Sequence, residues 1–177
     1  EIDALEVKIE GQCQRIIALH QPVAGDLRKV STALKMVTDI ERIADQASSI
    51  AKRARFINNL PEFAEIKLIQ PVYSLCDRNL DASIQAFLNA DPEAATAARL
   101  LDKQLGAAEK DLDRELITVM ESHHSSLEGY IHLIFVARFL ERVGDHAKNI
   151  CEDTIFIERA EDVRFTKDKR AEITAAV

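Results

Sequence analysis

Apolar residues recur at helical spacing along almost the whole chain, and very few residues interrupt the pattern. Among 177 residues there are only five glycines and four prolines. Hairpin turns and phosphate-cradling loops depend on these two residue types for their special backbone angles. The sequence therefore predicts an all-α protein, and it argues against a sheet-rich fold and against a glycine-loop nucleotide-binding fold.

The few breakers divide the chain into five predicted helices. These cover about residues 2–19, 25–57, 61–88, 91–122 and 125–157. Asp26 is a possible N-cap of the second helix, and Pro71 either kinks the third helix or separates a short lead-in from it. Asp91 followed by Pro92 is the expected start of the fourth helix, because Asp caps a helix and Pro fits its first position. Helices of about 30 residues are ~45 Å long, so we expect an elongated bundle.

The composition excludes some classes of partner and of compartment. The chain has 23 Lys and Arg against 30 Asp and Glu, a formal net charge of −7, with 5% aromatic residues and no Trp. A nucleic-acid binder needs a basic surface and usually stacking side chains, so we expect no nucleic-acid partner. Cys13, Cys76 and Cys151 have neither disulfide-framework nor zinc spacing, which favours a reducing cytoplasm. No apolar stretch approaches the ~20 residues of a transmembrane helix.

The chain contains an internal repeat with an offset of 100 residues. Residues 40–45 read Ile-Glu-Arg-Ile-Ala-Asp, and residues 140–145 read Leu-Glu-Arg-Val-Gly-Asp. We therefore predict a first unit over residues 1–60, a second unit over 61–160 and a charged tail over 161–177. Further apolar positions match at the same offset without a gap: Leu5 with Leu105, Ile16 with Leu116, Leu34 with Ile134, and Ile50 with Ile150.

The second unit has three predicted helices and the first unit has only two. The counterpart of the helix over residues 61–88 would lie before Glu1. The predicted architecture is therefore two three-helix bundles in tandem, with the first helix of the first bundle absent from this chain.

The repeated element places two carboxylates one helical turn apart in each unit, Glu41 with Asp45 and Glu141 with Asp145. Like charges at this spacing destabilise a helix by roughly a few tenths of a kcal/mol, so a compensating partner is expected. Hard divalent or trivalent cations bind carboxylate oxygens in such an arrangement. These four residues are therefore the candidate metal ligands.

Surface salt bridges are an alternative explanation for the same charges. Possible pairs at a spacing of three residues are Arg138 with Glu141, Arg42 with Asp45, and Asp39 with Arg42. A lattice of such pairs would make the protein a structural helical scaffold without metal.

Three segments are distinctive, and two of them include the repeated element. They are residues 19–28 (LHQPVAGDLR), 39–45 (DIERIAD) and 138–150 (RFLERVGDHAKNI). They resemble the PhoU family of phosphate-signalling regulators, and the resemblance extends over nearly the whole chain. It implies two three-helix bundles, each with an E(D)xxxD motif that binds metal ions, often as clusters of iron, zinc or other divalent cations. The positions that match the motif are Glu41, Asp45, Glu141 and Asp145, with Asp39 inside the first extended motif.

Additional ligands are needed, because four carboxylates on two helices cannot complete two clusters. Asp39 is not a straightforward co-ligand, since it lies ~200° around the helix from Glu41 and the second unit has Phe139 at that place. Neighbouring helices should therefore contribute, and Asp77 and Asp81 are candidates.

The resemblance also implies a role. Members of the family are cytoplasmic, homodimeric adaptors that negatively regulate phosphate uptake and the phosphate regulon. They link the ATPase subunit of the phosphate ABC transporter to a membrane sensor histidine kinase, so that they reach the membrane only through these partners.

The residues do not indicate an enzyme. No Ser/His/Asp or Cys/His grouping can be assembled for nucleophilic catalysis. A carboxylate-bridged di-metal enzyme in a helical bundle is the alternative, but such sites use Glu-x-x-His, and Ala44 and Gly144 stand three residues after the two glutamates. We expect Cys76 and Cys151 to fill the core and His146 to be a polar surface residue.

Overall fold

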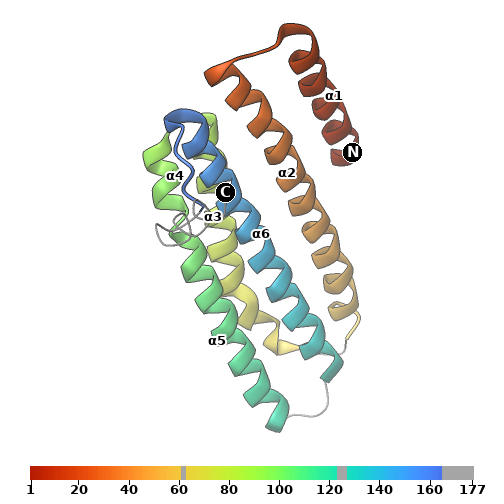
Figure 1. The fold of residues 1–177 in the computed structure, drawn as a ribbon. Coiled ribbons are helices and arrows are strands. Elements are labelled where there is room, and N and C mark those ends of the chain that lie inside the picture. The colour runs from red at the N-terminus through yellow and green to blue at the C-terminus, as the bar shows by residue number, and fades with distance from the viewer. Residues whose placement is uncertain (61–62, 123–126, 165–177) are drawn as a thin grey trace, which may run out of the picture.

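The fold is a bundle of long helices in the computed structural model, which describes residues 1–60, 63–122 and 127–164. Its elements are α1 (Ile2–His20), α2 (Ala24–Ile57), the 3₁₀ helix η1 (Ala64–Ile69), α3 (Gln70–Leu88), α4 (Pro92–Ala98), α5 (Leu101–Ser122) and α6 (Leu127–Arg159). No β-strand occurs in the described residues, and the helices lie side by side in an elongated molecule (Figure 1). The prediction of an all-α bundle is confirmed.

Two predicted helix starts are confirmed. The backbone N–H of Ala94 donates a hydrogen bond to Oδ1 of Asp91 at 2.9 Å, which is the expected cap of α4. Pro71 lies in the first turn of α3, directly after η1, so it separates a short lead-in from the helix. The predicted start of the last helix at residue 125 lies outside the described residues.

Two other predicted boundaries are wrong. The N-cap of α2 is Val23, which has no side-chain capping bond, and Asp26 lies inside the first turn, where its charge favours the helix dipole. The helix predicted over residues 91–122 is split into α4 and α5. At the break, Nε of Arg99 donates a hydrogen bond to Oε1 of Glu152 on α6 at 2.8 Å. This long-range contact fixes the break against α6.

The main hydrophobic core lies where α3 and α5 pack against α6. Side chains at its centre are at most 1% exposed, among them Val72, Leu105, Leu116 and Leu133. Each such side chain stabilises the fold by about 1.5–3 kcal/mol, because its apolar surface is removed from water. Gly144 allows α5 to approach α6 closely, since a Cβ at this position would lie 2.3 Å from Cδ2 of Leu105.

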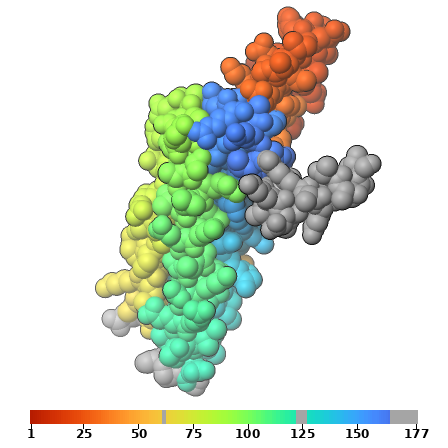
Figure 2. Space-filling model, turned by 60° about the vertical axis from the view of Figure 1, so that its left-hand side comes forward, coloured from red at the N-terminus to blue at the C-terminus, as the bar shows by residue number. Residues whose placement is uncertain are grey.

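The α1–α2 hairpin is less covered than the α5–α6 hairpin. Leu5 is 51% exposed, whereas its repeat counterpart Leu105 is fully buried. Ile40 is 44% exposed, and its counterpart Leu140 is 6% exposed. α3 packs on both α5 and α6, whereas the main packing of α1 is on α2 alone. Figure 2 shows the N-terminal segment, in red and orange, projecting at one end of the molecule. The division of the chain into two units and a tail stays a prediction.

Polar side chains join α2 to α6, which run antiparallel to each other (Figure 1). Nζ of Lys35 lies 2.7 Å from Oδ1 of Asp153, and Nε of Arg28 donates a hydrogen bond to the carbonyl of Ile157 at 2.9 Å. His146 of α6 also takes part in this contact, because its ring lies against Asp39 of α2. Its side chain is only 16% exposed. The prediction that His146 is a surface residue is wrong, because its ring binds a side chain of α2.

All three cysteines are buried and free. Burial raises the pKa of Cys76 and of Cys151 to about 12. Both residues therefore fill the core, as predicted. Within the described residues, every helix is either too short or too polar to span a bilayer.

Candidate metal sites

The first carboxylate pair lies on α2, the helix against which α1 packs. Glu41 is partly buried, and this burial raises the pKa of its carboxyl group. The negative charges of Asp45, Glu6 and Asp3 raise that pKa further, while Arg42 lowers it. Glu6 and Asp3 belong to α1, so two helices contribute to one group of carboxylates. We name Asp3, Glu6, Glu41 and Asp45 the α1–α2 acidic cluster.

The second pair lies on α6, the helix against which α5 packs. Burial raises the pKa of Glu141, and the charges of Asp145, Glu109 and Asp102 raise it further. Burial and the charge of Asp102 also raise the pKa of Asp145, while Lys148 lowers it. Nζ of Lys148 lies 3.2 Å from Oδ2 of Asp102, so a lysine neutralises part of this group.

Helix α5 carries a further E-x-x-x-D element, Glu109 with Asp113, which was not predicted. Burial and the charge of Asp113 raise the pKa of Glu109. Oδ1 of Asp113 is buried and has no hydrogen-bond partner among the described residues. A buried carboxylate oxygen without a partner is costly, and a cation would satisfy it. Together, Asp102, Glu109, Asp113, Glu141 and Asp145 form the α5–α6 acidic cluster.

The donor chemistry of both clusters fits a hard cation. Carboxylate oxygens are the ligands that such ions prefer, and the repulsion that raises the pKa of Glu41 and Glu141 would be relieved by a positive charge. As the side chains now lie, no three His, Cys, Asp or Glu of the described residues are close enough to hold one ion. Metal binding would therefore require carboxylate side chains to rotate toward a common point.

The salt bridges of the metal-free alternative do not form. Within the described residues, none of the pairs Arg138–Glu141, Arg42–Asp45 and Asp39–Arg42 lies within ion-pair distance. Arg42 and Arg142 act on Glu41 and Glu141 through their charge, but among the described residues neither motif glutamate forms an ion pair with a neighbouring arginine. This finding weakens the case for a purely salt-bridged scaffold.

Asp39 lies apart from the motif residues, on the side of α2 that faces α6. Its Oδ1 lies 2.7 Å from Nδ1 of His146 and accepts a hydrogen bond from Nδ2 of Asn149 at 3.1 Å. The side chain is 12% exposed. Its position agrees with the ~200° that separates it from Glu41 around the helix.

The charges that act on the second motif do not include the candidate co-ligands on α3. Asp77 and Asp81 are exposed, and neither is among the charges that shift the pKa of Glu141 or of Asp145. The acids that act on the motif residues lie on α1 for the α2 motif and on α5 for the α6 motif. Each of these helices directly precedes its motif helix in the chain.

These flanking acids were missed because they do not occupy equivalent positions of the repeat. Glu6 corresponds to Gly106, and Glu109 corresponds to Ile9, so a shift of 100 residues gives no acidic match. The spacing of Glu109 and Asp113 could have indicated the acids of α5, because it is the same as the spacing within the repeated motif.

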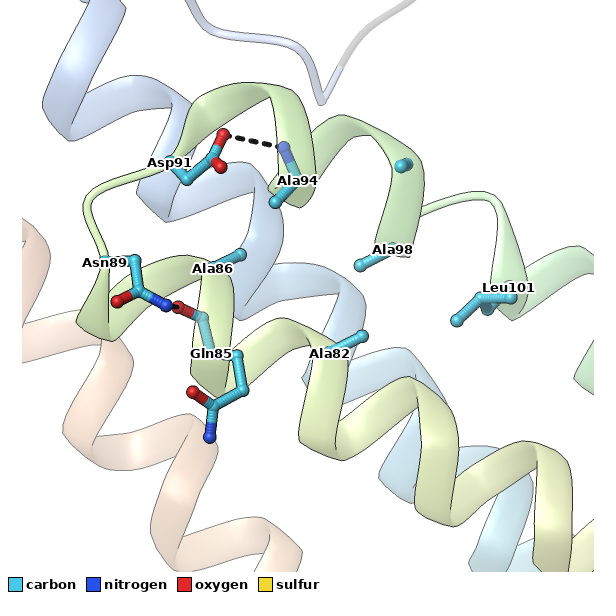
Figure 3. Close-up of a pocket in the computed structure, with 9 residues that line it drawn as sticks. Ala82, Gln85, Ala86, Asn89, Asp91, Ala94, Ala98 and Leu101 are labelled. Atoms are coloured by element: carbon cyan, nitrogen blue, oxygen red, sulfur yellow. Dashed lines mark hydrogen bonds between the residues drawn. The ribbon is translucent and has the colours of Figure 1, made fainter.

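A cavity that none of the acidic-cluster residues lines lies between α3 and α4 (Figure 3). Its volume is about 410 Å³, and alanines form most of its lining. Asp91 is engaged in capping α4, and Nδ2 of Asn89 donates a hydrogen bond to the carbonyl of Gln85 at 2.9 Å. The residues that line this cavity offer no catalytic set.

The fold and the clusters define a helical-bundle protein with a group of carboxylates on each of two long antiparallel hairpins. The sequence matches the family described as PhoU domain over residues 1–54 and 69–154. The chain belongs to the PhoU family.

Similar proteins carry names from phosphate transport. The phosphate-specific transport system accessory protein PhoU homolog of Xylella fastidiosa is 36% identical over 168 residues, which are 95% of this chain and 70% of the relative. The homolog of the same name from Pseudomonas aeruginosa is 34% identical over 168 residues, covering 93% of this chain and 68% of the relative. The predicted membership of the family is confirmed.

Solved structures agree with the fold. The crystal structure of PhoU from Pseudomonas aeruginosa has a TM-score of 0.84 and 32% identity, covering 90% of this chain and 77% of that chain. The phosphate transport system regulatory protein PhoU from Streptococcus pneumoniae has a TM-score of 0.80 and 27% identity, covering 93% and 77%. These are names of accessory and regulatory proteins, so the prediction that the chain is not an enzyme is confirmed.

Proposed function

We propose that this chain is a metal-binding regulatory adaptor that negatively regulates phosphate uptake and the phosphate regulon. It acts in the cytoplasm as a homodimer, and it contacts the ATPase subunit of a phosphate ABC transporter and a membrane sensor histidine kinase. The observation that carries the proposal is membership of the PhoU family, whose relatives are named as accessory proteins of a phosphate-specific transport system.

Divalent cations or iron bind at the two acidic clusters. Glu41 and Asp45 hold metal together with acids of α1, and Glu141 and Asp145 hold metal together with acids of α5. Two observations support this assignment: the mutual repulsion within each cluster and the buried, unpartnered Oδ1 of Asp113. A bound cation supplies positive charge that links the two helices of each hairpin.

Contact with proteins is supported by the exposed apolar surface of the first hairpin. Leu5 is 51%, Val7 68% and Leu19 64% exposed on α1. Leu5 and Leu19 lie about 40° apart around α1, and an exposed apolar helix face is typical of a surface that binds another protein. A second copy of the chain or a subunit of the transporter would cover them.

Metal analysis of protein purified without chelator tests the sites. The motif variants are Glu41→Ala/Asp45→Ala and Glu141→Ala/Asp145→Ala, and each should lose the metal of its own cluster. Asp111→Ala/Glu115→Ala is the matched control, because it removes an exposed i,i+4 carboxylate pair of α5 that belongs to neither cluster. Equal metal content in the motif variants and the control would contradict the assignment of these residues as metal ligands.

Affinity purification from phosphate-replete cells tests the adaptor role. Mass spectrometry of the bound proteins should identify the transporter ATPase subunit or the sensor kinase. Light scattering after size exclusion should give the mass of two chains. Repeated absence of both partners would contradict the adaptor role, and a monomeric mass would contradict the homodimer.

A further inference from the structure

A pocket of about 290 Å³ lies between α2 and α6, and none of the acidic-cluster residues lines it. We name it the α2–α6 pocket. Its lining comes from one face of each helix: Ser49, Lys52, Arg53 and Phe56 of α2, with His132 and Phe139 of α6.

Arg53 of α2 is held in place by two aromatic rings of α6. Its Nη1 donates a hydrogen bond to Nδ1 of His132 at 3.2 Å, and its guanidinium carbon lies 4.5 Å from the ring centroid of Phe135. His132 is itself stacked on Phe56, with 3.9 Å between ring centroids and 18° between ring planes. A guanidinium fixed in this way loses little side-chain entropy when it binds a ligand.

The charges at the pocket favour an anion. Its ionisable lining residues are Lys52, Arg53 and His132, and no carboxylate is among them. Within the described residues, neither Lys52 nor Arg53 belongs to an ion pair. This concentration of positive charge occurs in a chain whose formal net charge is −7.

The polar and apolar parts of the lining suit different parts of one ligand. One of the five N–H donors of Arg53 is used by His132, and the other four keep the planar guanidinium able to bind a carboxylate or phosphoryl group. Ser49 adds a hydroxyl to the lining. The rings of Phe56 and Phe139 offer an apolar wall. The volume of about 290 Å³ lies just below the ~300–1,000 Å³ that is usual for small-molecule sites, which favours a small ligand.

We propose that the α2–α6 pocket binds a small organic anion, in which a carboxylate or phosphate monoester is attached to an apolar or aromatic body. The anionic group binds Arg53 and Lys52, and the apolar body lies against Phe56 and Phe139. This site is separate from the acidic clusters and does not depend on the proposed metal binding.

Chemical-shift titration of the isotope-labelled full chain tests the proposal. Phenyl phosphate and benzoate are the probes, with chelator present so that no metal captures them. Inorganic phosphate supplies an anion without the body, and benzyl alcohol supplies the body without the charge. At least one aromatic anion should bind saturably with shifts at Arg53, Phe56 and His132, and should bind more tightly than either partial ligand.

Charge variants identify the residues that bind the anion. Arg53→Gln should weaken binding about tenfold or more, and Lys52→Gln about two- to fivefold. Arg55→Gln is the matched control, since it removes one exposed arginine of α2 that does not line the pocket. If Arg53→Gln does not fold, Lys52→Gln replaces an exposed side chain and still tests whether the positive charge of the pocket binds the anion.

Three results would overturn the proposal. The first is binding of neither aromatic anion, or shifts that cluster elsewhere on the molecule. The second is equal affinity in the Arg55→Gln control and in folded Arg53→Gln or Lys52→Gln. The third is affinity for inorganic phosphate or benzyl alcohol that matches the better aromatic anion, because the pocket would then not use both parts of the ligand.

Discussion

Nδ1 of His146 on α6 lies 2.7 Å from Oδ1 of Asp39 on α2, and the same oxygen accepts a hydrogen bond from Nδ2 of Asn149. The side chains of His146 and Asp39 are only 16% and 12% exposed. One carboxylate of the first hairpin thus binds two side chains of the second. Asp39 connects the hairpins, although it lies within two residues of the motif glutamate Glu41.

Asp39→Ala should lower the free energy of unfolding by about 1–3 kcal/mol, because it leaves the mostly buried ring of His146 without its partner and removes the acceptor of Asn149. Urea unfolding followed by circular dichroism measures the change. A double-mutant cycle with His146→Ala should give a coupling energy of about 0.5–3 kcal/mol. Asp81→Ala, on the exposed surface of α3, is the control and should stay within about 0.5 kcal/mol of the parent.

The same variant separates a connecting residue from a ligand. Asp39→Ala should retain the metal content of the parent protein, because its carboxylate is directed at α6 and not at the α1–α2 acidic cluster. A loss of metal as large as that of Glu41→Ala/Asp45→Ala would make Asp39 a ligand instead.

Gly144→Ala should destabilise the fold by about 1–3 kcal/mol through overpacking. The added Cβ would lie 2.3 Å from Cδ2 of Leu105, whose fully buried side chain has little room to move, and 3.4 Å from Nδ2 of Asn79. Thermal and urea unfolding measure the loss. Gly106→Ala is the matched control, since no atom lies within 4 Å of its added Cβ and the helix should gain up to about 1 kcal/mol. Equal stability of the two variants would refute close packing at Gly144.

Much of the fold could be predicted because it depends on local signals. Apolar periodicity and a few breakers located the long helices, and Asp91 capped its helix as its position predicts. The split at Arg99 could not be seen locally, because the contact that accompanies it involves Glu152, 53 residues away. The role of His146 was missed for the same reason, since its partner Asp39 is 107 residues distant.

The candidate sites were only partly predictable. The repeat made Glu41 and Glu141 visible as equivalent positions, but the acids that approach them from α1 and α5 are not equivalent to each other. Which carboxylates meet depends on how each hairpin pairs along its length. That pairing follows from packing, such as the close approach of α5 at Gly144, and not from spacing within one helix.

The thiols of Cys76 and Cys151 should react very slowly in the native protein. Burial raises their pKa to about 12, against about 8.5 for an unperturbed thiol, so the reactive thiolate is about a thousandfold rarer near pH 8. A Cys13→Ser variant leaves only these two thiols, and their reaction with a disulfide reagent reports the rate. The rate should rise about a thousandfold in denaturing urea.

The same shifts give a pH dependence of stability. A thiol whose native pKa is raised keeps its full contribution below its unfolded pKa and loses it as the pH rises above that value. The free energy of unfolding should therefore fall above about pH 8.5. Replacing Cys76 and Cys151 by Ala should reduce this fall, and an unchanged pH profile would contradict the assignment.

Glu109→Gln/Asp113→Asn should weaken metal binding at the α5–α6 acidic cluster although it leaves Glu141 and Asp145 intact. The charge of Glu109 acts on Glu141 from α5, and that of Asp113 acts on Glu109. Oδ1 of Asp113 is buried without a hydrogen-bond partner in the described residues, so the loss of both carboxylates removes donors that a cation needs. Competition with a fluorescent chelator should give an affinity about ten- to a hundredfold lower. Asp111→Asn/Glu115→Gln is the control, since it neutralises an exposed i,i+4 pair on the same helix. If both variants bind metal as the parent does, neither Glu109 nor Asp113 is a ligand, and Asp102 is the one carboxylate of the cluster that α5 could still contribute.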